Sequence, residues 1–136
     1  MDSIEREVYL QARPEQVWTA LTSPEHFAVW YAFGGASIDL HPGGRLLMRW
    51  PEHGEYRGFV EKVEPGRRFA YRYAVTPDVD PLPGNSNLVE FTLTPEGDCT
   101  RLHLAETGFD RLDLAADVQV SGQAWDNALA ALADSL

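Results

Sequence analysis

Arg-Pro-Glu-Gln-Val-Trp-Thr-Ala-Leu, residues 13–21, is the stretch that decides the fold. Pro14 suits the first turn of a helix, where its missing N–H would have had no partner in any case. Val17 and Leu21 are four residues apart and therefore lie on one face of that helix. The stretch predicts a short helix with one apolar side.

The neighbouring segments continue this pattern. Residues 3–12, with Ile4, Val8 and Leu10 among polar neighbours, are predicted to form a first strand. Downstream, Ser23-Pro24-Glu25 repeats the start signal of a helix, which carries Phe27 and Trp30 until Gly34-Gly35 ends it. Two short helices therefore follow the first strand.

A series of strands separated by turn residues occupies the middle of the chain. The predicted strands cover residues 36–40, 45–50, 55–63, 67–76, 88–94 and 100–107. The segment 77–87 contains three prolines and reads as a loop. Because the remaining turns are short, neighbouring strands are expected to be antiparallel.

The closing segment, from about Asp113, is predicted to be one long helix. Its apolar stripe consists of Val118, Gly122, Trp125, Leu129, Leu132 and Leu136. A strongly twisted sheet with one apolar face needs a cover, and this helix is long enough to supply it. The expected fold class is α+β, with a curved antiparallel sheet of six or seven strands wrapped around the C-terminal helix.

Length and charge limit the possible functions. The 136 residues suit a single domain, 1–136, with a real core. The formal net charge of −10 disfavours binding to nucleic acid and to anionic membranes. No apolar run approaches the ~20 residues that span a bilayer, and the first residues lack the apolar stretch of a signal peptide. We therefore expect a cytoplasmic protein.

Metal and nucleotide motifs are not found in the sequence. The single cysteine, Cys99, permits no internal disulfide, and the four histidines show no metal-binding spacing. Neither a nucleophile elbow nor a phosphate-binding loop is present. We predict no cofactor and no metal.

An ordered set of short motifs covers nearly the whole chain. It comprises Pro14-x-x-Val17-Trp18-x-Ala20-Leu21-x-x-Pro24-Glu25, Trp30, Pro42-Gly43-Gly44, Gly58, Val63-Glu64-Pro65-x-Arg67, Thr100-Arg101-Leu102-x-Leu104 and Trp125-x-x-x-Leu129-x-x-Leu132. With these motifs the chain resembles the START-like (SRPBCC) superfamily of helix-grip proteins. The branch it resembles most is the C-terminal domain of the ATPase activator of the ninety-kilodalton heat-shock chaperone. The chain departs from this family at one position. The family often places glycine immediately before its helix tryptophan, whereas Gly122 here stands three residues before Trp125.

The resemblance implies a cavity between the sheet and the long helix. It carries over no catalytic residue, because branches of the superfamily differ in their chemistry. Strand alternation, together with the helix positions, selects the candidate ligand-binding residues. These are Phe27, Trp30, Met48, Trp50, Phe69, Tyr71, Tyr73, Phe91, Leu104, Glu106, Gly122, Trp125 and Leu129. The same composition would also suit a filled core.

Two of these positions have alternative interpretations. Glu106 shares parity with Leu104 and should point inward, to anchor a ligand, to act as an acid or base, or to bond the start of the last helix. The hydroxyls of Tyr71 and Tyr73 are the preferred polar partners for a ligand. Gly122 either opens volume beside Trp125 or allows close packing of the helix on a strand.

Three function hypotheses remain. The preferred one is a carrier or sensor that binds a small, largely apolar molecule. The second is an enzyme that uses the cavity for cyclisation, dehydration or hydrolysis, with Glu106 as its acid or base. The third is a chaperone-associated, stress-response partner that docks on an arginine-bearing sheet face. That face comprises Arg45, Arg49, Arg68, Arg72 and Arg101, with Arg57 as a further candidate. The chain is expected to be a monomer or a homodimer.

Overall fold

The computed structural model describes residues 3–109 and 118–136. Its strands pair in the order β1-β7-β6-β5-β4-β3-β2, and every pair is antiparallel. The elements are β1 Ser3–Leu10, α1 Pro14–Thr22, α2 Pro24–Trp30, β2 Ala36–Ile38, β3 Arg45–Trp50, β4 Gly54–Glu64, β5 Arg68–Ala74, β6 Ser86–Glu96, β7 Cys99–Thr107 and α3 Val118–Ser135. The predicted α+β fold class is confirmed.

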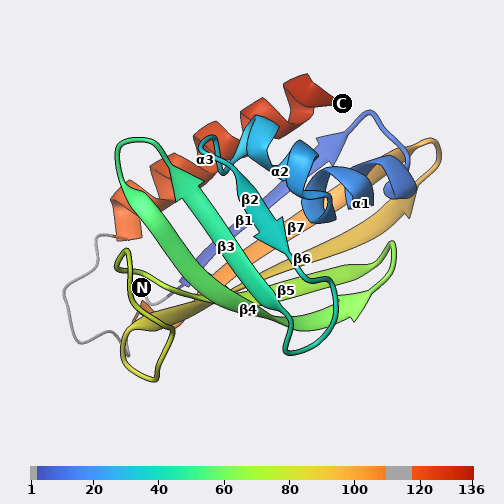
Figure 1. Cartoon of the computed structure of the whole chain (residues 1–136). Helices are drawn as coiled ribbons and strands as arrows, with labels where there is room; N and C mark the ends of the chain where they lie inside the picture. The colour runs from blue at the N-terminus through green and yellow to red at the C-terminus, as the bar shows by residue number, and fades with distance from the viewer. Residues whose placement is uncertain (1–2, 110–117) are drawn as a thin grey trace.

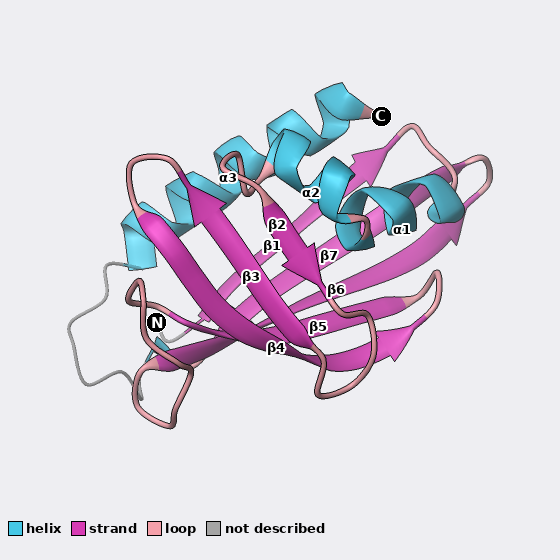
Figure 2. Cartoon of the chain, viewed as in Figure 1, coloured by secondary structure: helices cyan, strands magenta, loops and turns pink. Residues whose placement is uncertain are grey.

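The sheet curves around the helices in a single layer (Figure 1). Strands β2 to β7 follow one another as neighbours, as short hairpin connections require. The two helices α1 and α2 carry the chain from β1, at one edge of the sheet, to β2 at the other. Figure 2 shows α1, α2 and α3 on the same face of the sheet, with α3 running beside α2. This face is the inner face; the opposite face is the outer face.

Some predicted boundaries differ from the structure. β6 begins at Ser86, so Ser86 and Asn87 belong to the sheet and not to the predicted loop 77–87. Both residues pair with the end of β5, which extends the ladder beyond the apolar run that predicted the strand. Leu136 follows the end of α3 and is 40% exposed, so it does not belong to the buried stripe. The predicted start of this helix near Asp113 lies outside the described residues.

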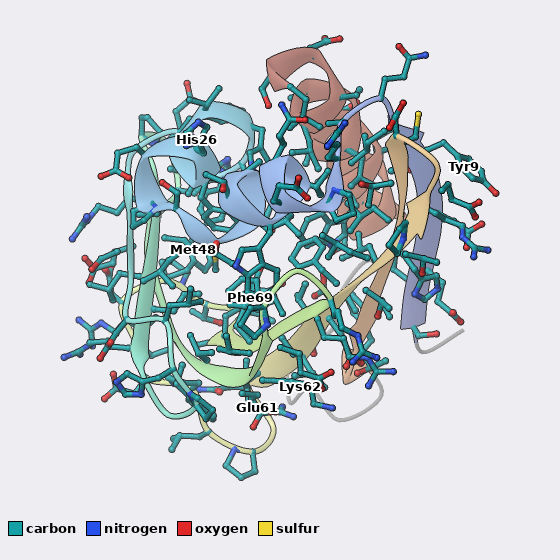
Figure 3. All side chains as sticks on the ribbon, turned by 90° about the vertical axis from the view of Figure 1, so that its right-hand side faces the viewer. Tyr9, His26, Met48, Glu61, Lys62 and Phe69 are labelled. Atoms are coloured by element: carbon teal, nitrogen blue, oxygen red, sulfur yellow. The ribbon has the colours of Figure 1, made fainter. Side chains whose placement is uncertain are left out.

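Side-chain alternation separates an inner and an outer set of residues along each strand. Figure 3 shows Met48 and Phe69 pointing into the shell, whereas Tyr9, Glu61 and Lys62 point away from it. A register shift between Val60 and Lys62 interrupts the alternation of β4. Such a bulge bends a strand locally, and here it adds to the curvature of the sheet.

The core lies between the inner face and the helices. Phe27, Trp30, Phe69, Phe91 and Leu104 have no exposed surface. The indole N–H of Trp30 donates to the carbonyl oxygen of Ala20 at 2.8 Å. This bond satisfies a buried polar group and fixes α2 against α1.

Candidate functional site

A buried carboxylate, Glu106, collects three hydrogen bonds at one end of the core. Its side chain is only 1% exposed. Oε2 accepts from the Tyr73 hydroxyl at 2.7 Å and from Asn87 Nδ2 at 2.8 Å. Oε1 accepts from Trp125 Nε1 at 2.7 Å. We call Tyr73, Asn87, Glu106 and Trp125 the inner cluster.

The sheet register assembles three members of the inner cluster. Tyr73 of β5 pairs with Asn87 of β6, and Glu106 of β7 pairs with Val89, two residues further along β6. Residues two apart on a strand share a face, so all three side chains point inward. Trp125 reaches them from α3 and closes the cluster. The inward orientation predicted for Glu106 is confirmed, and its carboxylate serves as an acceptor three times.

Two buried polar atoms, one within the inner cluster and one beside it, find no hydrogen-bond partner among the described residues. They are the hydroxyl of Tyr71 and the Oδ1 atom of Asn87. The Tyr31 hydroxyl is close enough to raise the pKa of Tyr71, but the geometry between the two hydroxyls does not meet the criteria for a hydrogen bond. Most buried polar groups are paired, because an unpaired one costs about 1–3 kcal/mol. The site therefore holds an unpaired hydroxyl, which can donate and accept, and an unpaired amide oxygen, which can accept.

Burial keeps the tyrosine hydroxyls in this region protonated. Desolvation is the main cause that raises the pKa of Tyr71 well above its ordinary value, and the nearby Tyr31 and Glu106 add to it. The pKa of Tyr73 is also well raised, by desolvation first and by Glu106 second. Desolvation likewise raises the pKa of Tyr31, although parts of the Tyr31 and Tyr73 side chains reach the surface. These groups act as hydrogen-bond donors across the physiological pH range.

An aromatic cluster leads from the inner cluster toward the surface. The Tyr31 ring stacks on Trp125, with ring centroids 4.6 Å apart, and meets Trp50 edge-on at 5.0 Å. Trp50 in turn contacts Tyr56 at 5.4 Å. Tyr31, Trp50 and Tyr56 are only partly buried. Trp50 ends β3 and Tyr56 lies near the start of β4, so Tyr31 links the β3–β4 hairpin to Trp125 of the inner cluster.

The structure brings most of the predicted site residues together. Tyr71 lies within ring-contact distance of Phe27, Phe69, Tyr73 and Phe91, with centroids 5.7–6.5 Å apart. The remaining predicted residues of the same core are Trp30, Met48, Trp50, Leu104, Trp125 and Leu129. Trp30 already uses its N–H within the fold, so it serves the packing of the helices.

Gly122 lies apart from this set. A Cβ atom built on it would meet Nη2 of Arg6, from β1, at 2.8 Å. The Arg6 guanidinium also pairs with Asp126, one turn further along α3, with Nε and Oδ1 2.7 Å apart. The absent side chain thus makes room for a strand arginine. Of the two interpretations given for Gly122, this arrangement supports close packing of helix on strand.

Two residues of the site are not in the predicted set. The turn-forming composition around Asn87 predicts a loop, yet Asn87 has the same parity as Val89 and points inward. Tyr31 follows α2 as its C-cap residue, with its backbone outside the helical region, so helical periodicity could not place its ring. Strand parity could have identified Asn87, whereas no local signal identifies Tyr31.

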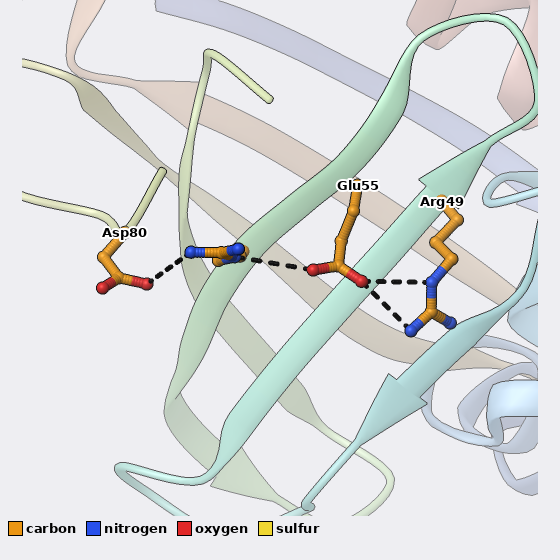
Figure 4. A network of polar contacts seen from close by, with 4 residues as sticks. Arg49, Glu55 and Asp80 are labelled. Carbon is orange, nitrogen blue, oxygen red and sulfur yellow. Dashed lines mark hydrogen bonds and ion pairs between the residues drawn. The ribbon is translucent and has the colours of Figure 1, made fainter. Parts of the chain in front are cut away.

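The outer face carries paired charges. The Glu55 carboxylate forms ion pairs with Arg49 at 3.1 Å and with Arg57 at 3.5 Å. Arg57 also pairs with Asp80 at 3.4 Å (Figure 4). Arg101 pairs with Glu96 at 3.2 Å. The predicted arginine-bearing face is therefore a surface of mixed charge.

Residues 3–109 and 118–136 contain neither a cluster of metal-binding side chains nor a helix able to span a membrane. No group of three or more His, Cys, Asp or Glu side chains there is placed to hold a metal ion. In the same residues, no helix combines the length and apolarity that crossing a membrane requires.

A family model matches residues 11–136 of the chain; it describes Activator of Hsp90 ATPase homolog 1-like proteins. No curated protein matches the chain.

Solved structures share the fold at low sequence identity. The solution structure of the Aha1 dimer from Colwellia psychrerythraea is 19% identical, with a TM-score of 0.80, and the match covers 100% of this chain and 96% of that one. Protein MLL2253 from Mesorhizobium loti is 22% identical with a TM-score of 0.80, covering 98% and 95%. DynU16, from the dynemicin biosynthetic locus, also has 22% identity and a TM-score of 0.80 over 98% of this chain, which spans 46% of the DynU16 chain.

Proposed function

Because the chain belongs to the family of Activator of Hsp90 ATPase homolog 1-like proteins, we propose that it uses the interior of this fold to bind a small, largely apolar molecule. The ligand lies against the aromatic side chains between the sheet and α3. The inner cluster and Tyr71 recognise its polar part. The protein then acts as a carrier or a sensor.

The observation that carries this proposal is the unpaired hydroxyl of Tyr71. It is fully buried, it has no hydrogen-bond partner among the described residues, and its raised pKa keeps the proton in place. A buried donor without a partner is costly in the free protein. A ligand with a carbonyl or ether oxygen would satisfy it and gain affinity from that single bond.

The aromatic surroundings define the rest of the ligand. Ring faces of Tyr31, Trp50 and Trp125 favour flat or hydrocarbon groups, which gain from burial in contact with π-systems. We infer an apolar molecule that carries at least one hydrogen-bond acceptor.

The other two hypotheses have weaker support. An acid or base in catalysis needs to reach substrate, but both oxygens of Glu106 are occupied by donors of the protein itself. A chaperone partner on the arginine-bearing face would compete with the ion pairs of Glu55 and Asp80. We therefore prefer the proposal of ligand binding in the interior.

Native mass spectrometry of the purified protein, compared with its denatured mass, tests the proposal. We expect a mass excess that disappears on denaturation. Tyr71→Phe should reduce the fraction of protein that retains this cargo, because the variant keeps the ring and loses only the donor. Tyr9→Phe is the matched control, since Tyr9 is 66% exposed on β1.

Binding of the neutral fluorescent probe N-phenylnaphthylamine extends the test to protein that loses its cargo during purification. We expect saturable binding that the extracted cargo displaces. Cargo retained equally by Tyr71→Phe and wild type would contradict the assigned role of Tyr71. Absence of both cargo and probe binding would contradict the binding function itself.

A further inference from the structure

A groove lies on the outer face of the sheet, opposite the inner cluster. Its volume is about 620 Å³. The floor includes Phe59 of β4 and Arg72 of β5, which are paired across the two strands. One side is formed by the loop residues 81–84, and the other by the ends of β1 and β7, at Ser3 and Thr107. We call this site the outer groove.

The loop that forms one wall is held in place by its own hydrogen bonds. Asn85 Oδ1 accepts from the backbone N–H of Leu82 at 2.7 Å, and Asn85 Nδ2 donates to the carbonyl oxygen of Asp80 at 3.1 Å. The Ser86 hydroxyl donates to the carbonyl oxygen of Leu82 at 2.7 Å. The contact between Arg57 and Asp80 ties the loop to β4 (Figure 4). A preformed wall spares a ligand the entropic cost of ordering it.

Arg72 is the one charged residue among the described residues that line the outer groove. Its side chain is 31% exposed and forms a long ion pair with Glu61, in which Nε and Oε2 are 3.9 Å apart, beyond hydrogen-bond length. Its Nη1 atom donates to the Ser86 hydroxyl at 3.4 Å, a long bond. The guanidinium therefore has donors available for an anion, in the planar fork that suits a carboxylate.

The remaining lining is apolar or carries hydroxyl groups. Phe59, Pro81, Leu82 and Pro83 supply apolar surface, and Leu82 is 60% exposed although it borders the groove. The volume falls within the ~300–1,000 Å³ typical of small-molecule sites. One cation beside an apolar wall suits a ligand with one anionic end and a hydrocarbon body.

We propose that the outer groove binds a small amphipathic monocarboxylate, with its carboxylate on Arg72 and its hydrocarbon chain along Phe59 and Leu82. The site is separate from the ligand position proposed for the interior. The carboxylate and the hydrocarbon chain of the ligand contact different residues, so the contribution of each can be tested separately.

Decanoate is the probe, followed by calorimetric titration of the whole chain at a concentration below micelle formation. We expect one saturable site and clearly weaker binding of decanol, which has the same chain without the charge. Arg72→Gln should weaken decanoate binding about tenfold or more, as expected for loss of a charge-assisted hydrogen bond. Arg68→Gln is the matched control, because Arg68 has the same parity on β5 but does not line the groove.

A second variant tests the apolar end. Leu82→Ala should weaken decanoate binding while leaving the sheet intact, since Leu82 belongs to an exposed part of the loop. Equal affinities of wild type and Arg72→Gln, or no binding of decanoate at all, would overturn the proposal. So would a loss of decanoate binding in Tyr71→Phe with Arg72→Gln unaffected, because that pattern places the ligand in the interior.

Discussion

At the scale of single residues, the inner cluster depends on the hydrogen-bond chemistry of one side chain. Trp125 Nε1 and Asn87 Nδ2 can only donate, and both point at the oxygens of Glu106. Asn87 also keeps an unpaired Oδ1. If a substitution replaced the Glu106 oxygen beside Asn87 with a donor, an amide flip of Asn87 would turn its Oδ1 toward that donor as an acceptor.

We predict different costs for two substitutions of Glu106. Glu106→Leu leaves three buried donors without an acceptor and should lower the free energy of unfolding by about 3 kcal/mol or more. Glu106→Gln keeps one oxygen for Trp125, and its NH₂ can donate to a flipped Asn87, so the loss should be about 1 kcal/mol. Urea denaturation measures both.

Glu90→Gln is the control for this pair, since Glu90 lies on the outer face of β6 and should change stability by less than about 0.5 kcal/mol. Equal losses for Glu106→Leu and Glu106→Gln would contradict the proposed flip of Asn87.

The sequence identified part of this cluster. Parity with Leu104 placed Glu106 inside, and alternation placed Tyr71 and Tyr73 on the same face. It could not predict which donors would meet the carboxylate, because Tyr73, Asn87 and Trp125 come from three different elements. Their meeting depends on strand register and on the position of α3, which only the assembled fold defines.

At the scale of elements, two glycines illustrate opposite reasons for lacking a side chain. A Cβ on Gly58 of β4 would collide with the carbonyl oxygen of Arg72 and approach Tyr73 Cα to 3.1 Å. Both atoms belong to the backbone of β5, which cannot move without disturbing the ladder between the two strands. At Gly122 of α3, the atom in the way is the far end of a flexible arginine.

We therefore predict that Gly58→Ala destabilises the protein by about 2 kcal/mol or more, as expected for an overpacked position. Gly122→Ala should have a small net effect, because the gain in helix propensity of about 1 kcal/mol is offset by displacement of Arg6 from a half-exposed ion pair. Thermal and urea unfolding of both variants measure the difference. A Gly58→Ala variant as stable as Gly122→Ala would show that β4 and β5 separate easily.

The element boundaries illustrate what local sequence can and cannot specify. β3 was predicted at Arg45–Trp50, where it is found, because apolar alternation and flanking glycines agree. Local sequence does not identify the start of β6. Ser86 and Asn87 are turn-forming residues, and their pairing with β5 holds them in the sheet. Tertiary pairing overrides local propensity at such positions.

At the scale of the whole molecule, the helices and the sheet share one core. Tryptophan fluorescence can follow both the helices and the sheet, because Trp18 lies in α1, Trp30 in α2, Trp50 in β3 and Trp125 in α3. The aromatic contacts of Trp30 with Phe91, and of Trp125 with Phe91, join the helices to the sheet. Separate unfolding of either layer would expose these rings.

We predict that residues 1–136 unfold in one cooperative step. Urea transitions followed by tryptophan fluorescence and by far-ultraviolet circular dichroism should coincide, as they do for a two-state domain. A fluorescence transition that precedes the loss of secondary structure would contradict a single cooperative unit.

The order of elements at this scale was predictable, because patterning and turn residues specify a long antiparallel sheet with one covering helix. The outer groove was not predictable. Its lining comes from Ser3, from Phe59 and Arg72 in mid-chain, and from Thr107, which lie far apart in the sequence. The register of four strand pairs brings these residues together: Ser3 pairs with Thr107, Thr107 with Leu88, Leu88 with Arg72, and Arg72 with Phe59.

The inner cluster and the outer groove lie back to back across one thickness of sheet. Tyr73 and Arg72, Asn87 and Ser86, and Glu106 and Thr107 are consecutive residues that serve opposite faces. Natural selection can therefore act on the two faces separately, although they share the same three strands. Among descendants of this chain, neighbouring positions on these strands should therefore diverge at unequal rates.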